Sequence, residues 1–294
     1  MRVVVLGASG LIGHKLFQTF TDRFDQCYAV LHRDKNIFAD CGLFNTDKVI
    51  DKVDATDFDH LQGVLHAVDP DVILNCVGIT KRKPAVNDPI EAITTNCLLP
   101  HRLAQWGKNN DARVIHFSTD CVFNGELGNY NEQSDTTGED AYGKTKALGE
   151  IRYPHSLTIR SSFIGRELSE KSELLEWFLA QRGGAIRGFT KAWYSGVSTI
   201  QMCRVIGDII ENHQDLGGLY QLAMPEPISK YDLLQLANKA FDAKVDIEPD
   251  DSFEIKPTLD GSKLKAAINV ELPSWESMMT ELAADPLYQE SKSA

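Results

Sequence analysis

The chain has 294 residues, 43% of them hydrophobic and 24% charged, which is the composition of an ordinary soluble globular protein. This length is sufficient to bury a large core in one large domain or in two. The formal net charge of −12 argues against a general surface for nucleic acid or for anionic membranes. Small anionic ligands remain compatible with it, because they need only local positive charge or a helix N-terminus.

The N-terminus and the cysteines indicate a cytoplasmic protein. Residues 1–6 run directly into a glycine turn, which is too short for a signal peptide, and no stretch approaches the length of a membrane span. The six cysteines include no Cys-x-x-Cys pair, so we expect neither a disulfide framework nor a metal site.

A buried strand followed by a glycine-rich turn opens the chain. Residues 3–6 form a continuous apolar run, typical of a strand buried on both faces of a parallel sheet. A helix to about residue 20 follows the turn, whose residues include Gly7, Ser9, Gly10, Leu11, Ile12 and Gly13. Such glycines permit a tight turn and close approach of a pyrophosphate, which the helix N-terminus favours. Glycines alone fit an ordinary turn, but between a strand and a helix they predict dinucleotide binding.

The end of the second predicted strand bears on cofactor choice. Residues 27–31 form this strand, and His32 and Arg33 follow it. Dinucleotide folds that prefer NADP place a cation here for the 2′-phosphate, whereas those that prefer NAD place an acid. Arg33 therefore favours NADP(H). NAD(H) stays open, because Asp34 comes next and Arg33 could equally be a solvated loop residue.

Two further strands are predicted before residue 80. Residues 49–54 form a short third strand, after which Asp54 and Ala55 could contact an adenine. Residues 72–78 form the fourth, and its small-residue end suits backbone approach to a ligand. That end consists of Asn75, Cys76, Val77 and Gly78. A basic cluster at residues 79–84 could hold a phosphate or sugar, or could simply be solvated.

A helix over residues 89–106, carrying Asn96, precedes the fifth predicted strand at residues 114–117. Residues 118–125 cap this strand, and a sixth strand covers residues 157–160. Since the carboxyl ends of parallel strands meet at one edge, the caps of these strands should line a single ligand site.

Tyr142 and Lys146 are four residues apart, so on a helix they share one face. A phenol beside an ammonium should have a lowered pKa and could exchange a proton with a substrate oxygen. The spacing alone is weak evidence, because Tyr288 and Lys292 repeat it in a polar tail. Tyr142 and Lys146 are favoured over the second pair because the glycine turn and the segment containing Thr119 accompany them.

Beyond residue 160 the pattern is less regular. Helices are predicted over residues 173–181, 198–211 and 229–241, and strands over residues 185–187 and 218–223. The last of these strands should join the main sheet, and residues 286–294 should be frayed.

These residues together resemble the extended short-chain dehydrogenase/reductases, and within them the dTDP-4-dehydrorhamnose reductase-like group. The family's glycine pattern, its Ser-Thr-Asp-aromatic-Val-Phe-x-Gly segment (residues 118–125) and its Tyr-Gly-x-Thr-Lys-x-x-Gly-Glu helix (residues 142–150) are all met. Cys121 replaces the usual tyrosine, and a late motif around residues 256–264 survives in part.

The resemblance implies an α/β fold: a Rossmann-type doubly wound parallel sheet with a smaller C-terminal α/β substrate-binding lobe. The NAD(P)-binding domain would comprise residues 1–160 and about 195–223, and the lobe about 161–194 and 224–294. By family role Tyr142 is the proton donor, Lys146 holds the nicotinamide ribose and lowers the pKa of Tyr142, and Thr119 binds the reacting oxygen. A homodimer is also a family expectation.

The resemblance favours a reductase of a nucleotide-linked 4-keto sugar. An epimerase or dehydratase that retains its nicotinamide, and a non-catalytic regulatory subunit, remain open. Cys121 argues against elimination, since a thiol is a poor base at neutral pH and the sequence shows no cation beside it. Candidates for the substrate diphosphate, each equally compatible with a surface role, are Arg160, Arg166, Arg187 and Lys256.

Overall fold

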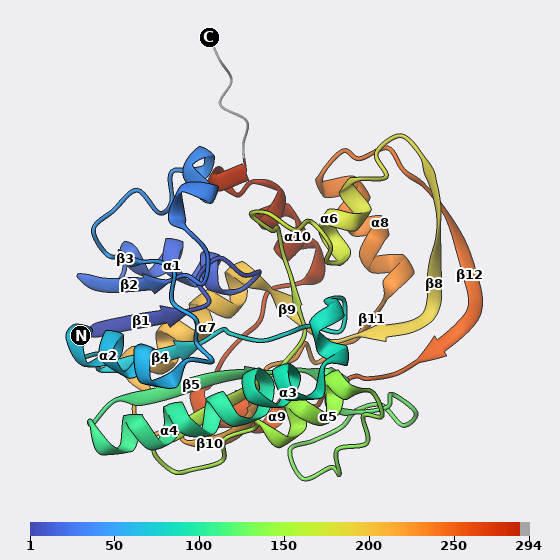
Figure 1. Cartoon of the computed structure of the whole chain (residues 1–294). Helices are drawn as coiled ribbons and strands as arrows, with labels where there is room; N and C mark the ends of the chain where they lie inside the picture. Colours follow the sequence, from blue (N-terminus) through green and yellow to red (C-terminus); the bar gives the residue numbers. More distant parts are fainter. Residues whose placement is uncertain (289–294) are drawn as a thin grey trace.

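The computed structural model describes residues 1–288 and contains a central sheet of seven parallel strands (Figure 1). Across the sheet their order is β10, β6, β5, β4, β1, β2, β3. The strands are β1 (Arg2–Leu6), β2 (Gln26–Val30), β3 (Val49–Ile50), β4 (Val72–Asn75), β5 (Arg113–Ser118), β6 (Ser156–Arg160) and β10 (Gly218–Gln221). The chain reverses direction across the sheet between β1 and β4, which is where such folds bind ligands. The doubly wound α/β fold is confirmed.

Helices cover both faces of this sheet. The first helices are α1 (Gly13–Thr21), α2 (Phe58–Val68), α3 (Pro89–Ala92), α4 (Leu99–Asn109), α5 (Ala141–Leu148), α6 (Leu174–Leu179) and α7 (Thr199–Asn212). Val3 and Val5 of β1 pack in the core beneath α1 and α7, whereas Val4 and Leu6 pack beneath α2 and α4. Burying each such side chain contributes about 1.5–3 kcal/mol, which explains why β1 is apolar throughout.

A second sheet lies beside the central one, where Figure 1 shows the long strands β8 and β12 side by side. It consists of β11 (Ile228–Ser229), β8 (Ala185–Tyr194) and β12 (Asp246–Ile255), and a two-stranded pair joins β7 (Phe163–Ile164) to β9 (Val197–Ser198). The remaining helices are α8 (Lys230–Ala240), α9 (Ser262–Ile268) and α10 (Trp275–Ala283). Short 3-10 turns occupy Lys35–Cys41, Pro84–Asn87, Asp120–Val122 and Pro286–Tyr288.

Capping side chains start two helices where the sequence predicted them. The Ser198 hydroxyl accepts a hydrogen bond from the Gln201 amide at 3.1 Å, at the start of α7. The Ser229 hydroxyl accepts one from the Asp232 amide at 3.0 Å, at the start of α8. Each bond satisfies a backbone donor that has no partner inside its helix.

The second sheet departs most from the sequence prediction. The strand predicted over residues 185–187 is the ten-residue β8, and its parallel partner β12 was not predicted. β12 lies at the sheet edge and is mostly exposed, with Glu248, Asp250 and Glu254 along it. Acidic residues disfavour strands in general but are tolerated at an edge, where they discourage pairing with other chains.

Two other predictions need correction. The helix predicted over residues 89–106 is interrupted by a π-helical turn at Ile93–Leu98, between α3 and α4. The predicted frayed tail is ordered at its start, because the Tyr288 hydroxyl lies 2.7 Å from His14 Nε2. Lys292 and the rest of residues 289–294 lie outside the described residues. No helix in the part of the chain that the structure describes could span a membrane.

Candidate active site

A cavity of about 790 Å³ opens where β1, β2, β4, β5 and β6 end. Its lining comes from the glycine turn, the segments after these strands, α5, the segment 161–175, and the second sheet. The predicted site residues among its lining are Ser9, Gly10, Leu11, Ile12, His32, Arg33, Asn75, Cys76, Val77, Gly78, Thr119, Tyr142 and Lys146. Residues separated by more than 130 positions in the sequence thus share one cavity.

The glycine turn is shaped to admit an anion. Gly7 has a φ of +71°, and a Cβ on Gly13 would lie 2.3 Å from the Gly7 carbonyl oxygen, so neither position accepts a side chain without strain. Helix α1 begins after Ile12 without a side-chain cap. Apart from the His14 amide, which donates to the Gly10 carbonyl at 3.1 Å, its first turn can therefore offer N–H groups to a ligand. Since Ser9 and Ile12 line the cavity, the turn fits the diphosphate of a dinucleotide.

Arg33 lines the cavity at the end expected to receive the adenosine of the cofactor. Its guanidinium lies 3.4 Å from the Glu170 carboxylate, which also pairs with Lys83 at 3.0 Å. Asp54 and Ala55 do not line the cavity, contrary to expectation. Asp54 accepts hydrogen bonds from the amide and hydroxyl of Thr56. The third strand ends at Ile50, earlier than predicted.

Asn96 fixes the segment after β4 against α5. Its side-chain oxygen accepts from the Ile79 amide at 2.8 Å, and its amide nitrogen donates to the Ile79 carbonyl and to the Thr145 hydroxyl at 3.0 and 3.2 Å. All these contacts are buried, and the π-helical turn contains Asn96 itself. Such turns often occur at functional sites, because they redirect a side chain within a helix.

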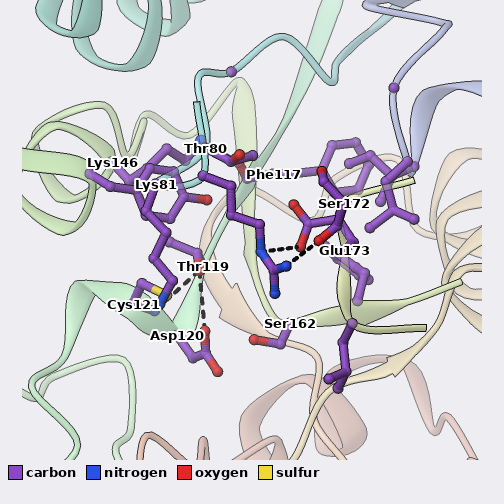
Figure 2. A pocket seen from close by; sticks show the side chains of 18 of the residues that line it. Thr80, Lys81, Phe117, Thr119, Asp120, Cys121, Lys146, Ser162, Ser172 and Glu173 are labelled. Carbon is purple, nitrogen blue, oxygen red and sulfur yellow. Dashed lines mark hydrogen bonds and ion pairs between the residues drawn. The ribbon is translucent and has the colours of Figure 1, made fainter. Parts of the chain in front are cut away.

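Thr119 lies at the end of β5, where its hydroxyl contacts Asp120 Oδ1 at 3.2 Å and accepts from the Cys121 amide at 3.1 Å. Figure 2 shows Lys81 reaching to Cys121 beside Thr119, and its Nζ lies 3.7 Å from Cys121 Sγ. The sequence had shown no such cation. Burial, and then the Asp120 carboxylate, nevertheless raise the pKa of Cys121 to about 11, so the thiol stays protonated at neutral pH.

Tyr142 and Lys146 share helix α5, which begins after Asp140, whose carboxylate accepts from the Gly143 amide at 2.6 Å. Burial raises the pKa of Tyr142, Cys121 and Asp120 add to this rise, and a hydrogen bond with Thr119 opposes it. Burial therefore outweighs the lowering effect that we expected from Lys146.

The side chain of Lys146 also makes its hydrogen bonds to groups other than Tyr142. Lys146 Nζ donates to the Phe117 carbonyl at 2.7 Å and lies 3.1 Å from His116 Nε2, so it points at β5. The sequence analysis missed His116; the available signal was a lone histidine within an apolar, buried strand. Burial lowers the pKa of Lys146 to about 8.

None of the four cations proposed for a substrate diphosphate lines the cavity. Arg160 is fully buried and forms two hydrogen bonds to the Glu150 carboxylate, at 2.8 and 2.7 Å. Arg166 pairs with Glu176, and the last two, Arg187 and Lys256, pair with acidic residues of β12. The cations that line the cavity are Arg33, Lys81, Arg82, Lys83, Lys146 and Lys230.

The family model described as the RmlD substrate binding domain matches residues 1–287. The chain belongs to this family. Its match to the probable low-salt glycan biosynthesis reductase Agl14 of Haloferax volcanii is 29% identical and covers 60% of this chain and 57% of that protein's length. A match to methionine adenosyltransferase 2 subunit beta of Danio rerio is 26% identical, over 82% of this chain and 74% of that one.

The fold is also that of solved RmlD-family structures. The dTDP-4-dehydrorhamnose reductase of Bacillus anthracis, in complex with NADP, superposes with a TM-score of 0.78 at 20% sequence identity. The superposition covers 97% of this chain and 99% of that chain, so the second sheet and the C-terminal helices belong to the shared fold.

Proposed function

We propose that this protein is an NADPH-dependent reductase of a nucleotide-linked 4-keto sugar. The observation that carries the proposal is the convergence of Thr119, Tyr142 and Lys146 on one cavity that also contains the glycine turn. The names of the Haloferax and Bacillus proteins support a reductase, and NADP in the latter supports a nicotinamide cofactor.

When bound, the nicotinamide supplies the hydride. This chain supplies the proton and the orientation. Because burial raises its pKa, Tyr142 keeps its proton at neutral pH and can give it to the alkoxide that develops on the substrate. Thr119 lies beside Tyr142, and its single hydroxyl proton, which Asp120 accepts in this structure, can turn to the same oxygen and stabilise the charge as it appears.

Residues of both proposed parts of the chain line the cavity. We assign residues 1–160 and about 195–223 to cofactor binding, and residues of about 161–194 and 224–294 to substrate binding. The second group supplies Trp193, Tyr194, Lys230 and Phe253 to the lining. Aromatic faces and a cation suit a nucleotide base, a sugar and a phosphate.

A dehydratase is less well supported, because elimination needs a second acid or base beside Asp120. At that position the chain has Cys121, whose thiol stays protonated with a pKa of about 11. A non-catalytic regulatory subunit is the second candidate function, and the observation in its favour is the similarity to the Danio rerio subunit.

The deciding experiment is a panel of nucleotide 4-keto sugars assayed for NADPH oxidation, with the reduced sugar quantified. The proposal expects one NADPH consumed per alcohol formed. Parallel tubes with a nucleotide hexose and no reductant should leave the sugar unchanged, and a 4-keto-6-deoxy product there would indicate a dehydratase. Absence of turnover across the panel would favour the regulatory subunit.

A further inference from the structure

A chain of buried polar side chains connects Lys146 to the strands of the central sheet. Asn75 at the end of β4, His116 within β5 and Lys146 on α5 are 0%, 0% and 4% exposed. Asn75 Nδ2 lies 3.1 Å from His116 Nδ1, and His116 Nε2 lies 3.1 Å from Lys146 Nζ. These side chains are almost completely buried, although Asn75 and Lys146 also line the cavity, so most of their polar atoms find partners within the chain.

The Val77 amide determines how this chain of hydrogen bonds is oriented. This backbone N–H donates to Asn75 Oδ1 at 3.2 Å, so the oxygen must face Val77 and the side-chain nitrogen must face His116. An amide nitrogen can only donate, which makes His116 Nδ1 an acceptor. Burial lowers the pKa of His116 well below its usual value, so the ring is neutral. A hydrogen bond with the Asn75 backbone acts in the opposite direction but is outweighed by burial and by Lys146, so the contact with Asn75 Nδ2 places the single ring proton on Nε2.

This tautomer is a poor partner for a charged lysine. The Nε2–H points at Lys146 Nζ, and an ammonium has three donors and no acceptor. The other contact of Nζ, the Phe117 carbonyl at 2.7 Å, is satisfied by either an ammonium or an amine. Only the neutral amine can accept the proton that His116 offers.

We propose that His116 is a positioning residue for Lys146: held in its Nε2–H tautomer by Asn75, it weakens the binding of the third proton of Lys146. The inference rests on the proposed function in that it gives Lys146 a part in proton transfer. A lysine that exchanges a proton near neutral pH can replenish the site after Tyr142 has given its own proton.

Burial is the first cause of a weakened proton on Lys146, and we propose that the contact with His116 adds to it. Burial lowers the pKa of Lys146, whereas Glu150 and Cys76, the other titratable groups acting on it among the described residues, raise it. Glu150 is itself paired with Arg160 and Arg152, which limits its effect. His101 and Lys146 both lower the pKa of His116, which keeps its ring neutral.

The test measures protons directly and needs no substrate. In the cofactor-free full chain, ¹⁵N spectra of histidine should show His116 protonated on Nε2 and bare on Nδ1. Spectra of lysine labelled at Cε and Nζ, with Lys146→Arg to identify the signal, should give a pKa for Lys146 near 8.

His116→Gln replaces the ring by an amide that can turn its oxygen to the ammonium. The pKa of Lys146 should then rise by about one to two units, the effect of one hydrogen bond accepted from a charged group. Ile115→Val, which shortens a side chain in the core on the other face of β5, is the matched control and should leave that pKa unchanged.

An unchanged Lys146 pKa in His116→Gln would overturn the proposal. So would a wild-type His116 protonated on Nδ1, a measurement that stands even if the variant does not fold. If no nucleotide 4-keto sugar in the panel is reduced, the measured His116 tautomer and Lys146 pKa still stand. The two proposals can therefore fail separately.

Discussion

Two buried lysines in this protein have opposite surroundings. The side chain of Lys15, on α1, is 6% exposed and forms an ion pair with Asp285, which is 1% exposed. Lys146 is equally buried, but its partners are a carbonyl and a neutral histidine. A buried lysine that is paired with a carboxylate can hold two segments of the chain together. A buried lysine whose partners are neutral has its pKa lowered instead.

The region around Lys15 fastens the end of the described chain to the glycine turn. The adjacent His14 holds the Gly10 carbonyl through Nδ1 at 2.8 Å and the Tyr288 hydroxyl through Nε2 at 2.7 Å. The Arg166 guanidinium lies 4.5 Å from the centre of the Tyr288 ring. We expect substitutions here to change stability, and substitutions around Lys146 to change activity.

Tyr142→Phe should have the largest effect and should leave the free energy of unfolding nearly unchanged. Loss of the general acid should lower kcat by about 10²- to 10⁴-fold. Tyr288→Phe is the matched control from the Lys15 region and should keep wild-type kcat while losing stability. Steady-state kinetics and chemical denaturation of both variants decide the matter. Wild-type turnover in Tyr142→Phe would exclude it as the acid.

Lys15→Met should lower the free energy of unfolding by about 3–5 kcal/mol, because it leaves Asp285 buried without its cation. Lys15→Met with Asp285→Leu removes both charges and should recover part of the loss. Lys239→Met, which breaks an ion pair whose side chains are 75% and 60% exposed, should change stability little. The three variants are compared by the midpoints of their denaturation curves. A small loss in Lys15→Met alone would remove the contrast between the two lysines.

Stability should depend on pH through Lys146. Its pKa of about 8 in the folded chain lies below the usual 10.5, so between these values the unfolded chain binds more protons. The cost of burying the charge is full below pH 8 and is relieved as the pH rises towards 10.5. Relative to Lys146→Met, the wild type should therefore gain about 3 kcal/mol over this range, measured by denaturation at each pH. A constant difference would contradict this.

Arg33→Ala should have the smallest effect, because Arg33 is an exposed cation paired with Glu170. Loss of a charge-assisted contact should weaken NADPH binding about tenfold more than NADH binding. Arg204→Ala is the matched control: its side chain is 53% exposed against 51% for Arg33, and it does not line the cavity. Calorimetric binding constants for both cofactors measure the difference. Equal losses, or a native preference for NADH, would refute the assignment.

The sequence predicted the central sheet well, because buried parallel strands and their helices have strong periodic signals. The glycine turn and Thr119, Tyr142 and Lys146 were brought to one cavity as expected. Local pattern could not show where the Lys146 side chain points, since that depends on a partner thirty positions earlier in the chain, His116. The raised pKa of Tyr142 has burial as its main cause, and the spacing of Tyr142 and Lys146 in the sequence does not show burial.

The strands of the second sheet and the contacts of the cations could not be predicted from the sequence, for a different physical reason. β12 is exposed and acidic, so it has neither the apolar run nor the alternation that marks a buried strand. Arg160 looked like a ligand for a phosphate, yet it is buried against Glu150. Charge alone does not reveal whether a cation meets a ligand or a carboxylate of its own chain.

The π-helical turn at Ile93–Leu98 makes the site sensitive to chain length. A π turn contains one residue more than an ordinary helical turn, and each helical residue advances the chain by about 100°. Removing one residue there would let the helix become regular at little cost to its own backbone. It would also rotate Asn96 away from Ile79 and Thr145, and so free the segment after β4 from α5. In this segment a deletion that suits the helix should damage the enzyme.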